Sequence, residues 1–275
     1  MINRKTLKPG MVAMLGIQLD ENSSFMVGSS KAPDIIRKAF HSSSSNLCAE
    51  NGVDLSNEPR FTDLGNFIPV TGPSGFDQIT AEISKILDCQ ANLTVLGGDH
   101  SITYPIFKAY NKKYKTLNIL HFDAHPDLYD EYEGNRHSHA CPFARIMEDC
   151  PPKRLVQVGI RTMTPHLRSQ VERFDVETID MIAMDQKPFI PDFDGPIYLS
   201  LDLDVLDPAF APGVSHHEPG GLSTRDVLKI IHSVRAPIVG ADIVELNPKR
   251  DPSGITAMAA SKFLKEIAGH MIRNN

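Results

Sequence analysis

The sequence predicts an α/β fold, a three-layer α/β/α sandwich with a mostly parallel sheet. Two observations predict it. Apolar runs alternate with stretches of helical period along the whole chain, and most of these runs lack polar alternation. Strands that are buried on both faces of a parallel sheet have continuous runs of this kind. The chain has 275 residues, 41% of them hydrophobic, and no shift in composition divides it. We therefore expect one domain over residues 1–275.

The expected elements follow the chain in order. Strands are predicted where short runs are rich in Val, Ile and Leu: Met11–Ile17, Leu93–Leu96, Leu117–Phe122, Leu155–Ile160, Ile197–Leu203 and Ile238–Leu246. Helices are predicted where the apolar residues recur at helical spacing: Pro33–Phe40, Phe76–Leu87, Thr103–Tyr114, Pro142–Glu148, Pro165–Phe174, Thr224–Ser233 and Ala257–Ile272. Segments 46–59 and 188–196 contain turn-forming residues and are predicted to be loops. Strands that alternate with helices are joined by right-handed crossovers.

Charge and cysteine content exclude several classes of protein. The net charge of −6 argues against nucleic acid or an anionic membrane as a partner, because both attract basic patches. The four cysteines form no CxxC pair, so we expect a reducing, cytoplasmic location. The polar first ten residues and the lack of any run of 18 apolar residues predict neither a signal peptide nor a transmembrane helix.

Polar and charged side chains follow four of the expected strands at the points where these strands end. The four clusters are Gly97-Gly-Asp-His-Ser101, Asp123-Ala-His-Pro-Asp127, Asp202-Leu-Asp204 and Val244-Glu245. In open parallel sheets, ligands bind outside the carboxyl ends of the strands. The sequence therefore predicts that these clusters converge on one crevice.

The clustered residues are of the types that bind divalent metal ions. Asp123, His125 and Asp127 alternate at period two and would share one side of an extended segment, and Asp202 and Asp204 repeat this pattern. Together with His100, four carboxylates and two imidazoles are available. Carboxylates crowded in this way need cations to neutralise them. Such a ligand set suits hard or borderline divalent ions, and six ligands are enough for a pair of them.

Each cluster taken alone also has a structural explanation. An Asp-x-Asp pair at a strand end is usually a loop cap or a solvated pair, and His100 after two glycines would cap the helix that follows. The Asp123–Asp127 cluster is more specific, since three ligand-type residues at period two directly after an apolar strand are uncommon. Four such clusters at successive strand ends favour a metal centre.

The motifs resemble those of the ureohydrolase superfamily, which contains the arginases and agmatinases. The resemblance covers nearly the whole chain and rests first on Gly97-Gly-Asp-His-Ser101, Asp123-Ala-His-Pro-Asp127 and Ser200-Leu-Asp-Leu-Asp-Val-Leu-Asp-Pro208. Other segments look most like the plant-type arginases: Asn22-Ser-Ser-Phe25, Glu133-Gly-Asn135, Ser138-His-Ala140, Phe143-Ala-Arg-Ile146 and Glu218-Pro-Gly-Gly-Leu-Ser223.

The resemblance implies a metal arrangement and an assembly. It implies that one Mn²⁺ ion is held by His100, Asp123, Asp127 and Asp202. It implies that a second is held by His125, Asp123, Asp202 and Asp204, with a hydroxide between the two ions. Other divalent ions such as Ni²⁺ or Co²⁺ remain alternatives for this site. The resemblance also implies a compact α/β/α fold and a homo-oligomer, either a trimer or a hexamer.

The same resemblance implies catalytic roles and a small guanidino compound as substrate. Glu245, within a Val-Glu-x-Asn-Pro pattern, would pair with the planar guanidinium, and Asp127 would orient the hydroxide. His139 would donate a proton to the leaving amine, since its ordinary pKa is near 6.5. Taken alone, Glu245 would be a strand-end salt bridge and His139 an ordinary surface histidine.

The sequence departs from the animal arginases where those enzymes bind the end of the substrate far from the guanidino group, so their mode of recognition cannot be transferred to this chain. Thr162, Met163 and Thr164 stand where those enzymes carry acidic residues, and the loop that reads the α-carboxylate there is replaced by Leu128–His139. In this loop, we expect Asn135 and Arg136 to hold a carboxylate. The acidic residues Asp130, Glu131 and Glu133 would favour a bare ammonium group.

The sequence therefore predicts a binuclear hydrolase that releases urea, first an arginase that converts L-arginine to L-ornithine. The same-class alternatives are an agmatinase, which converts agmatine to putrescine, and a hydrolase of another guanidino compound. The alternatives from other classes are a single-zinc amide hydrolase with a deacetylase-like fold and a non-catalytic scaffold. The complete ligand set argues against a scaffold.

Overall fold

The computed structural model describes residues 4–274 and contains one eight-stranded sheet in the order β2-β1-β3-β8-β7-β4-β5-β6. Every neighbouring pair of strands in this sheet is parallel. The strands are β1 (Val12–Ile17), β2 (Phe61–Phe67), β3 (Asn92–Leu96), β4 (Asn118–Phe122), β5 (Arg154–Ile160), β6 (Glu177–Asp180), β7 (Ile197–Asp202) and β8 (Ile238–Val244).

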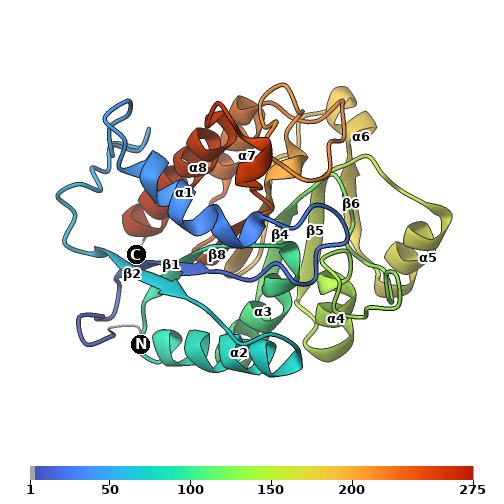
Figure 1. The fold of residues 1–275 in the computed structure, drawn as a ribbon, viewed down its shortest axis with the longest axis horizontal. Coiled ribbons are helices and arrows are strands. Elements are labelled where there is room, and N and C mark those ends of the chain that lie inside the picture. Colours follow the sequence, from blue (N-terminus) through green and yellow to red (C-terminus); the bar gives the residue numbers. More distant parts are fainter. Residues whose placement is uncertain (1–3, 275) are drawn as a thin grey trace.

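Helices cover both faces of the sheet (Figure 1). In the view shown, α1, α7 and α8 lie above it and α2, α3 and α4 lie below it. The α-helices are α1 (Ala32–Phe40), α2 (Pro73–Leu87), α3 (Thr103–Lys113), α4 (Pro142–Asp149), α5 (Pro165–Phe174), α6 (Met181–Gln186), α7 (Thr224–Ser233) and α8 (Ile255–Arg273). The predicted α/β/α fold with a parallel sheet is confirmed.

The core consists of two apolar clusters, one on each side of the sheet. Neighbouring residues of one strand alternate between them: Met14 belongs to the cluster that includes Phe263 of α8, and Leu15 belongs to the one that includes Phe107 of α3. Met14 and Leu15 are therefore both fully buried, although they point to opposite faces of the sheet. This two-sided burial explains why the strands have continuous apolar runs.

The structure contains two strands and one α-helix that were not predicted from the sequence. Strands β2 and β6 form the two edges of the sheet, and their residues are half-buried or exposed, so they lack a continuous apolar run. Helix α6 has only six residues, and none of them is buried. The six predicted strands and seven predicted helices are present, with ends that shift by at most three residues. The predicted loops 46–59 and 188–196 contain no helix or strand.

The two central strands, β7 and β8, end earlier than predicted because the chain turns out of the sheet directly after each of them. After Asp202, the residues Leu203–Val205 form a short 3₁₀ helix. After Val244, the backbone of Glu245 takes a left-handed φ of 67°. Both turns direct acidic side chains to the end of the sheet where the other clusters lie.

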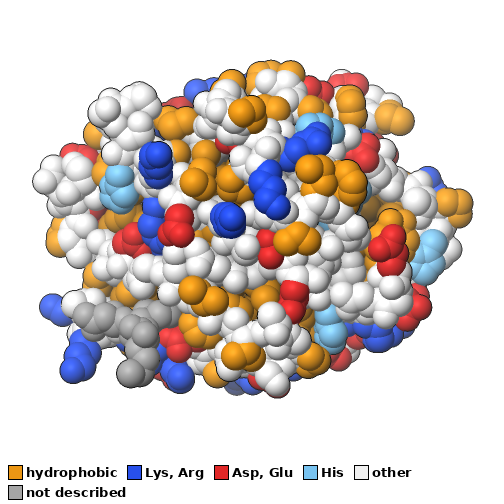
Figure 2. Space-filling model, viewed as in Figure 1, with side chains coloured by type: hydrophobic (Ala, Val, Ile, Leu, Met, Phe, Trp, Pro, Cys, Tyr) orange, Lys and Arg blue, Asp and Glu red, His pale blue; other side chains and the backbone are white. Residues whose placement is uncertain are grey.

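No helix among the described residues is long and apolar enough to cross a membrane. On the face shown in Figure 2, acidic and basic side chains are interspersed, without a broad patch of either sign.

Candidate metal centre and catalytic cavity

The four predicted clusters meet at the carboxyl ends of β3, β8, β7 and β4, which are neighbours in the sheet. His100 is fully buried and lies at the centre of one group. Its Nδ1 atom is 3.3 Å from Asp123 Oδ2, 3.1 Å from Asp127 Oδ2 and 3.1 Å from Asp202 Oδ2. One imidazole nitrogen thus faces three carboxylate oxygens.

Hydrogen bonds on the far side of the His100 ring decide which nitrogen carries the proton. The Ser200 hydroxyl donates to Asp242 Oδ1 at 2.7 Å, so its oxygen accepts from His100 Nε2 at 2.9 Å. His100 Nδ1 is then the ring nitrogen that can offer a lone pair to a metal ion, and it has no hydrogen-bond partner. A lone pair that faces three carboxylates is repelled unless a cation lies between them. The residues present therefore fit a metal ion at this point.

A second group adjoins the first through Asp123. His125 Nδ1 is 3.3 Å from Asp123 Oδ1 and 3.0 Å from Asp204 Oδ2. The two oxygens of Asp123 therefore face different histidines, Oδ2 toward His100 and Oδ1 toward His125. Metal–ligand bonds of about 2.1 Å place neighbouring octahedral ligands about 3 Å apart, as these atoms are. The spacing fits two ions that share one carboxylate.

The electrostatics of the cluster also favour cations. Burial, reinforced by the Asp204 carboxylate, raises the pKa of Asp202 well above its ordinary value. Burial and the Asp123 carboxylate raise the pKa of Asp127 to about 6. Burial alone would lower the pKa of His100, but the three facing carboxylates raise it well above its ordinary value. Divalent ions would offset this crowding of negative charge and keep the carboxylates ionised.

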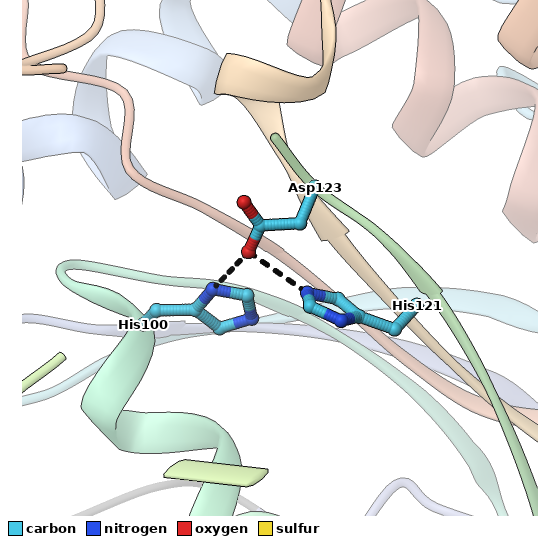
Figure 3. Close-up of side chains that lie close together, drawn as sticks. All are labelled: His100, His121 and Asp123. Carbon is cyan, nitrogen blue, oxygen red and sulfur yellow. Dashed lines mark hydrogen bonds and ion pairs between the residues drawn. The ribbon is translucent and has the colours of Figure 1, made fainter. Parts of the chain in front are cut away.

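His121 was not predicted from the sequence, and its ring faces the same carboxylate oxygen of Asp123 as the ring of His100 (Figure 3). Its Nε2 atom is 2.9 Å from Asp123 Oδ2. The Gln157 amide donates to the Pro126 carbonyl at 2.7 Å, and the same nitrogen lies 3.0 Å from His121 Nδ1. Nδ1 therefore accepts, Nε2 carries the proton, and His121 donates to Asp123 rather than offering a lone pair to a metal. The period-two pattern, extended back by one step from Asp123, would have found this residue.

Gln157→Leu is expected to weaken metal binding by about 10–100-fold, as for other groups that orient a ligand from behind. Without the amide, the His121 ring loses the contact that keeps its proton on the side of Asp123. Calorimetric titration of the metal-free protein with Mn²⁺ measures the effect. Gln170→Leu is the matched control, because this buried glutamine also donates to a carbonyl, that of Leu128, but touches no ligand. Equal affinities for the two variants would contradict the assigned role.

A cavity of about 250 Å³ opens above the metal-type cluster. It is lined by Ser24, His125, Asp127, Tyr129, Tyr132, His139, Ala140, Thr162, Thr164, Leu167, Asp202, Asp204, His216, Glu218 and Glu245. His139 and Glu245 are both buried there, and His139 Nδ1 is 3.0 Å from Glu245 Oε1. The same Oε1 accepts from the backbone N–H of His100 at 2.8 Å.

The pair of His139 and Glu245 is charged. Burial lowers the pKa of His139, but the Glu245 carboxylate outweighs it, and the pKa rises to about 9. Burial raises the pKa of Glu245, yet His139 brings it below its ordinary value. The cavity thus contains a protonated imidazole and an ionised carboxylate. Glu245 and Asp127, with φ values of 67° and 52°, are among the few non-glycine residues in a left-handed conformation, which is common at functional sites.

The structure does not bring Asn135 and Arg136 into this cavity, and the expectation that they hold a substrate carboxylate is corrected here. Arg136 is exposed, and its guanidinium pairs with Glu148 at 3.1 Å. Asn135 donates to the side chain of Asn22 at 3.1 Å and joins two loops. Both residues lie on a loop whose conformation the sequence pattern did not specify.

The acidic residues of the same loop also lie away from the cavity. Asp130 pairs with Arg173 at 2.9 Å, and neither Glu131 nor Glu133 lines the cavity. No role was predicted from the sequence for the lining residues Ser24, Tyr129, Tyr132 and Glu218. Except for Glu218, they carry no charge that would have marked them in the sequence.

The fold and the cluster together define a class: the metal-dependent hydrolases that use the carboxyl edge of an α/β/α sheet. The model of the Arginase family matches residues 11–269, and the chain belongs to this family. Members of the family are hydrolases that cleave a guanidino C–N bond with a binuclear metal centre, so the predicted ureohydrolase resemblance is confirmed.

Relatives are found among both arginases and agmatinases. "Arginase 1, mitochondrial" of Arabidopsis thaliana is 45% identical over 273 residues, which are 93% of this chain and 80% of the relative. The agmatinase of Halalkalibacterium halodurans is 32% identical over 97% of this chain and 94% of its own. Among solved structures, the arginase from Medicago truncatula matches with a TM-score of 0.89 and 43% identity, over 95% of this chain and 87% of that one.

The predicted cytoplasmic location is contradicted by these relatives. Plant arginases that are 44–45% identical to this chain are named mitochondrial, and one of them chloroplastic or mitochondrial. The prediction was wrong because it rested on the four cysteines, all of which are free. Unpaired cysteines indicate a reducing environment, and this does not distinguish the cytoplasm from the interior of an organelle.

Proposed function

We propose that this protein is an arginase that hydrolyses L-arginine to L-ornithine and urea. The observation that carries the proposal is the buried, ionised carboxylate of Glu245, which lines the cavity beside the metal-type cluster. A guanidinium is planar and cationic and pairs with a carboxylate through two parallel hydrogen bonds. The identity of 45% with a plant arginase supports arginine as the first candidate substrate.

We propose that the cluster holds two manganese ions. His100, Asp123, Asp127 and Asp202 would bind one, and His125, Asp123, Asp202 and Asp204 the other. When bound, the ions acidify a water molecule so that it can attack the guanidinium carbon at neutral pH. Oxygen-rich ligation with two imidazoles suits Mn²⁺ and does not suit copper(I).

The residues of the chain would bind and orient the substrate and handle its protons. Both hydrogen bonds to Glu245 end on Oε1, so among the described residues Oε2 has no donor and is open to the guanidinium. His139, protonated by virtue of its raised pKa, would supply the proton that the leaving amine needs.

We further propose that residues 1–275 form one domain and that the protein is a homo-oligomer, a trimer or a hexamer. The single sheet that spans β1 to β8 supports the first point. The exposed large apolar side chains of Ile182 and Ile190 support the second, because a subunit interface would bury them.

Agmatine is the second candidate substrate, and the composition of the cavity favours it. Within residues 4–274, no Lys or Arg lines the cavity, so the α-carboxylate of arginine would depend on hydroxyl groups such as those of Tyr129, Thr162 and Thr164. Glu218 offers a carboxylate to an ammonium group, which agmatine and arginine both carry.

Urea release from a panel of guanidino compounds, after loading with Mn²⁺ and separately with Ni²⁺, is the test. We expect arginine to have the highest kcat/KM, because relatives that are 44–45% identical to this chain are named arginases. Arg136→Ala is expected to leave kcat/KM for arginine and agmatine unchanged, since Arg136 pairs with Glu148 at the surface. Turnover of agmatine alone would identify an agmatinase, and no turnover of any guanidino compound would refute the proposed class.

A further inference from the structure

Both ring nitrogens of His139 have partners within the protein. Nδ1 faces the Glu245 carboxylate at 3.0 Å, and Nε2 lies 2.8 Å from the Ser24 hydroxyl oxygen. An ionised carboxylate only accepts hydrogen bonds, so Nδ1 keeps its proton. The exchangeable proton of His139 is therefore the one on Nε2, and Nε2 faces Ser24.

The loop that carries Ser24 is held in place through Asn22, two residues before it. The backbone N–H of Asn22 donates to Asp99 Oδ2 at 3.0 Å. The backbone N–H of His139 donates to the carbonyl of the same Asn22 at 3.0 Å. The segments that carry the hydroxyl and the imidazole are thus joined directly, which fixes their separation.

The hydroxyl connects His139 with the interior of the cavity. Ser24 is half-buried and lines the cavity, whereas Glu245, the other partner of the ring, is buried and can only accept. The His216 ring packs against the His139 ring, with their centroids 5.2 Å apart, but among the described residues the two rings form no hydrogen bond. A hydroxyl can donate and accept at once, so it can pass on a proton without acquiring a charge.

We propose that Ser24 is a catalytic residue that orients His139 and carries its proton to the leaving amine. This inference rests on the proposed function. In the step, the N–H bond at His139 Nε2 breaks as an O–H bond forms at Ser24. The original Ser24 O–H bond breaks as its proton passes to the amine nitrogen. Ser24 is neutral before and after, His139 becomes neutral, and the amine gains one proton.

The experiment compares Ser24→Ala with Ser24→Thr, which keeps the hydroxyl. For Ser24→Ala we expect kcat to fall by about 10–100-fold, with KM within about twofold of wild type, because proton transfer is impaired and guanidinium binding is not. Ser24→Thr should restore most of kcat. Ser23→Ala is the matched control: its hydroxyl lies 3.4 Å from Asp99 and does not reach His139. Metal content should be the same in all variants.

A double variant decides whether Ser24 acts through His139. In the His139→Ala background, Ser24→Ala should cause no further loss, because the proton it would carry is absent. Multiplicative losses, or a Ser24→Ala enzyme as fast as wild type, would overturn the inference. The imidazole nitrogen NMR shifts of His139 in the Mg²⁺-loaded protein give a readout without turnover. The Nε2 signal should move in Ser24→Ala and stay in Ser23→Ala. An unmoved signal would overturn the inference whatever substrate the enzyme uses.

Discussion

Asp123→Ala is expected to abolish both metal binding and urea release. Its two carboxylate oxygens face His100 and His125 separately, at 3.3 Å each, so its removal takes one ligand from each half of the cluster. Metal content, measured by elemental analysis, should fall from two ions per chain to fewer than one. Activity should fall by at least about 10³-fold, because the ions contribute several kcal/mol to transition-state stabilisation.

The Asp123→Ala protein should still fold, since the substitution removes one of several buried carboxylates that repel one another. Circular dichroism checks this point. Asp77→Ala, at an exposed position of α2, is the control and should retain both metal and activity. A variant at position 123 that still binds two ions would show that the carboxylate does not join the two sites, and a single tightly held zinc in the wild type would exclude the two-manganese centre.

His139→Ala is expected to lower kcat by about 10²–10⁴-fold and to leave two metal ions bound, as for the loss of a general acid. His139 contacts Glu245 and Ser24 but none of the six metal-type residues through a hydrogen bond. A loss of turnover with full metal content therefore separates proton donation from metal binding. Steady-state kinetics together with elemental analysis of the same preparation provide both quantities.

His137→Ala is the control for the histidine variant, because its ring stands two residues away and packs against Phe76 and Tyr104. It should turn over at nearly the wild-type rate. If His139→Ala did so as well, the proton donor would have to be sought at His216, which lines the cavity, or at His217.

The fold could be predicted from the sequence because the buried parts of this chain have local patterns. Six strands are apolar on both faces, and each lies between helices of regular period, so the α/β/α class follows. Strands β2 and β6 escaped prediction for the opposite reason. They pair with one neighbour each and keep polar side chains that remain partly in solvent.

The candidate metal residues could be predicted because they follow strands directly and have strongly characteristic chemistry. Four carboxylates and two imidazoles at strand ends form a pattern that can be recognised in the sequence without knowing any distance between them. Ser24 and Gln157 have no such pattern, since a serine in a loop and a glutamine in a strand occur in most proteins. Their roles depend on partners far away in the chain, at His139 and at His121 and Pro126. Arg136 is the opposite case. It was predicted to bind substrate because it is charged and close to the site in the sequence, but its side chain pairs with Glu148 instead.

The sequence by itself determined six of the strands, seven of the helices, the parallel sheet and the candidate metal residues, because each depends on neighbours along the chain. The tertiary structure alone decided the strand order, in which β8 and β7 lie between β3 and β4. This order places Asp202, Asp204 and Glu245 between His100 and Asp123, so that separate clusters become one site. Strand order depends on packing between elements that are far apart in the chain, such as β3 and β8, where Leu93 pairs with Gly240, and no local periodicity encodes that packing.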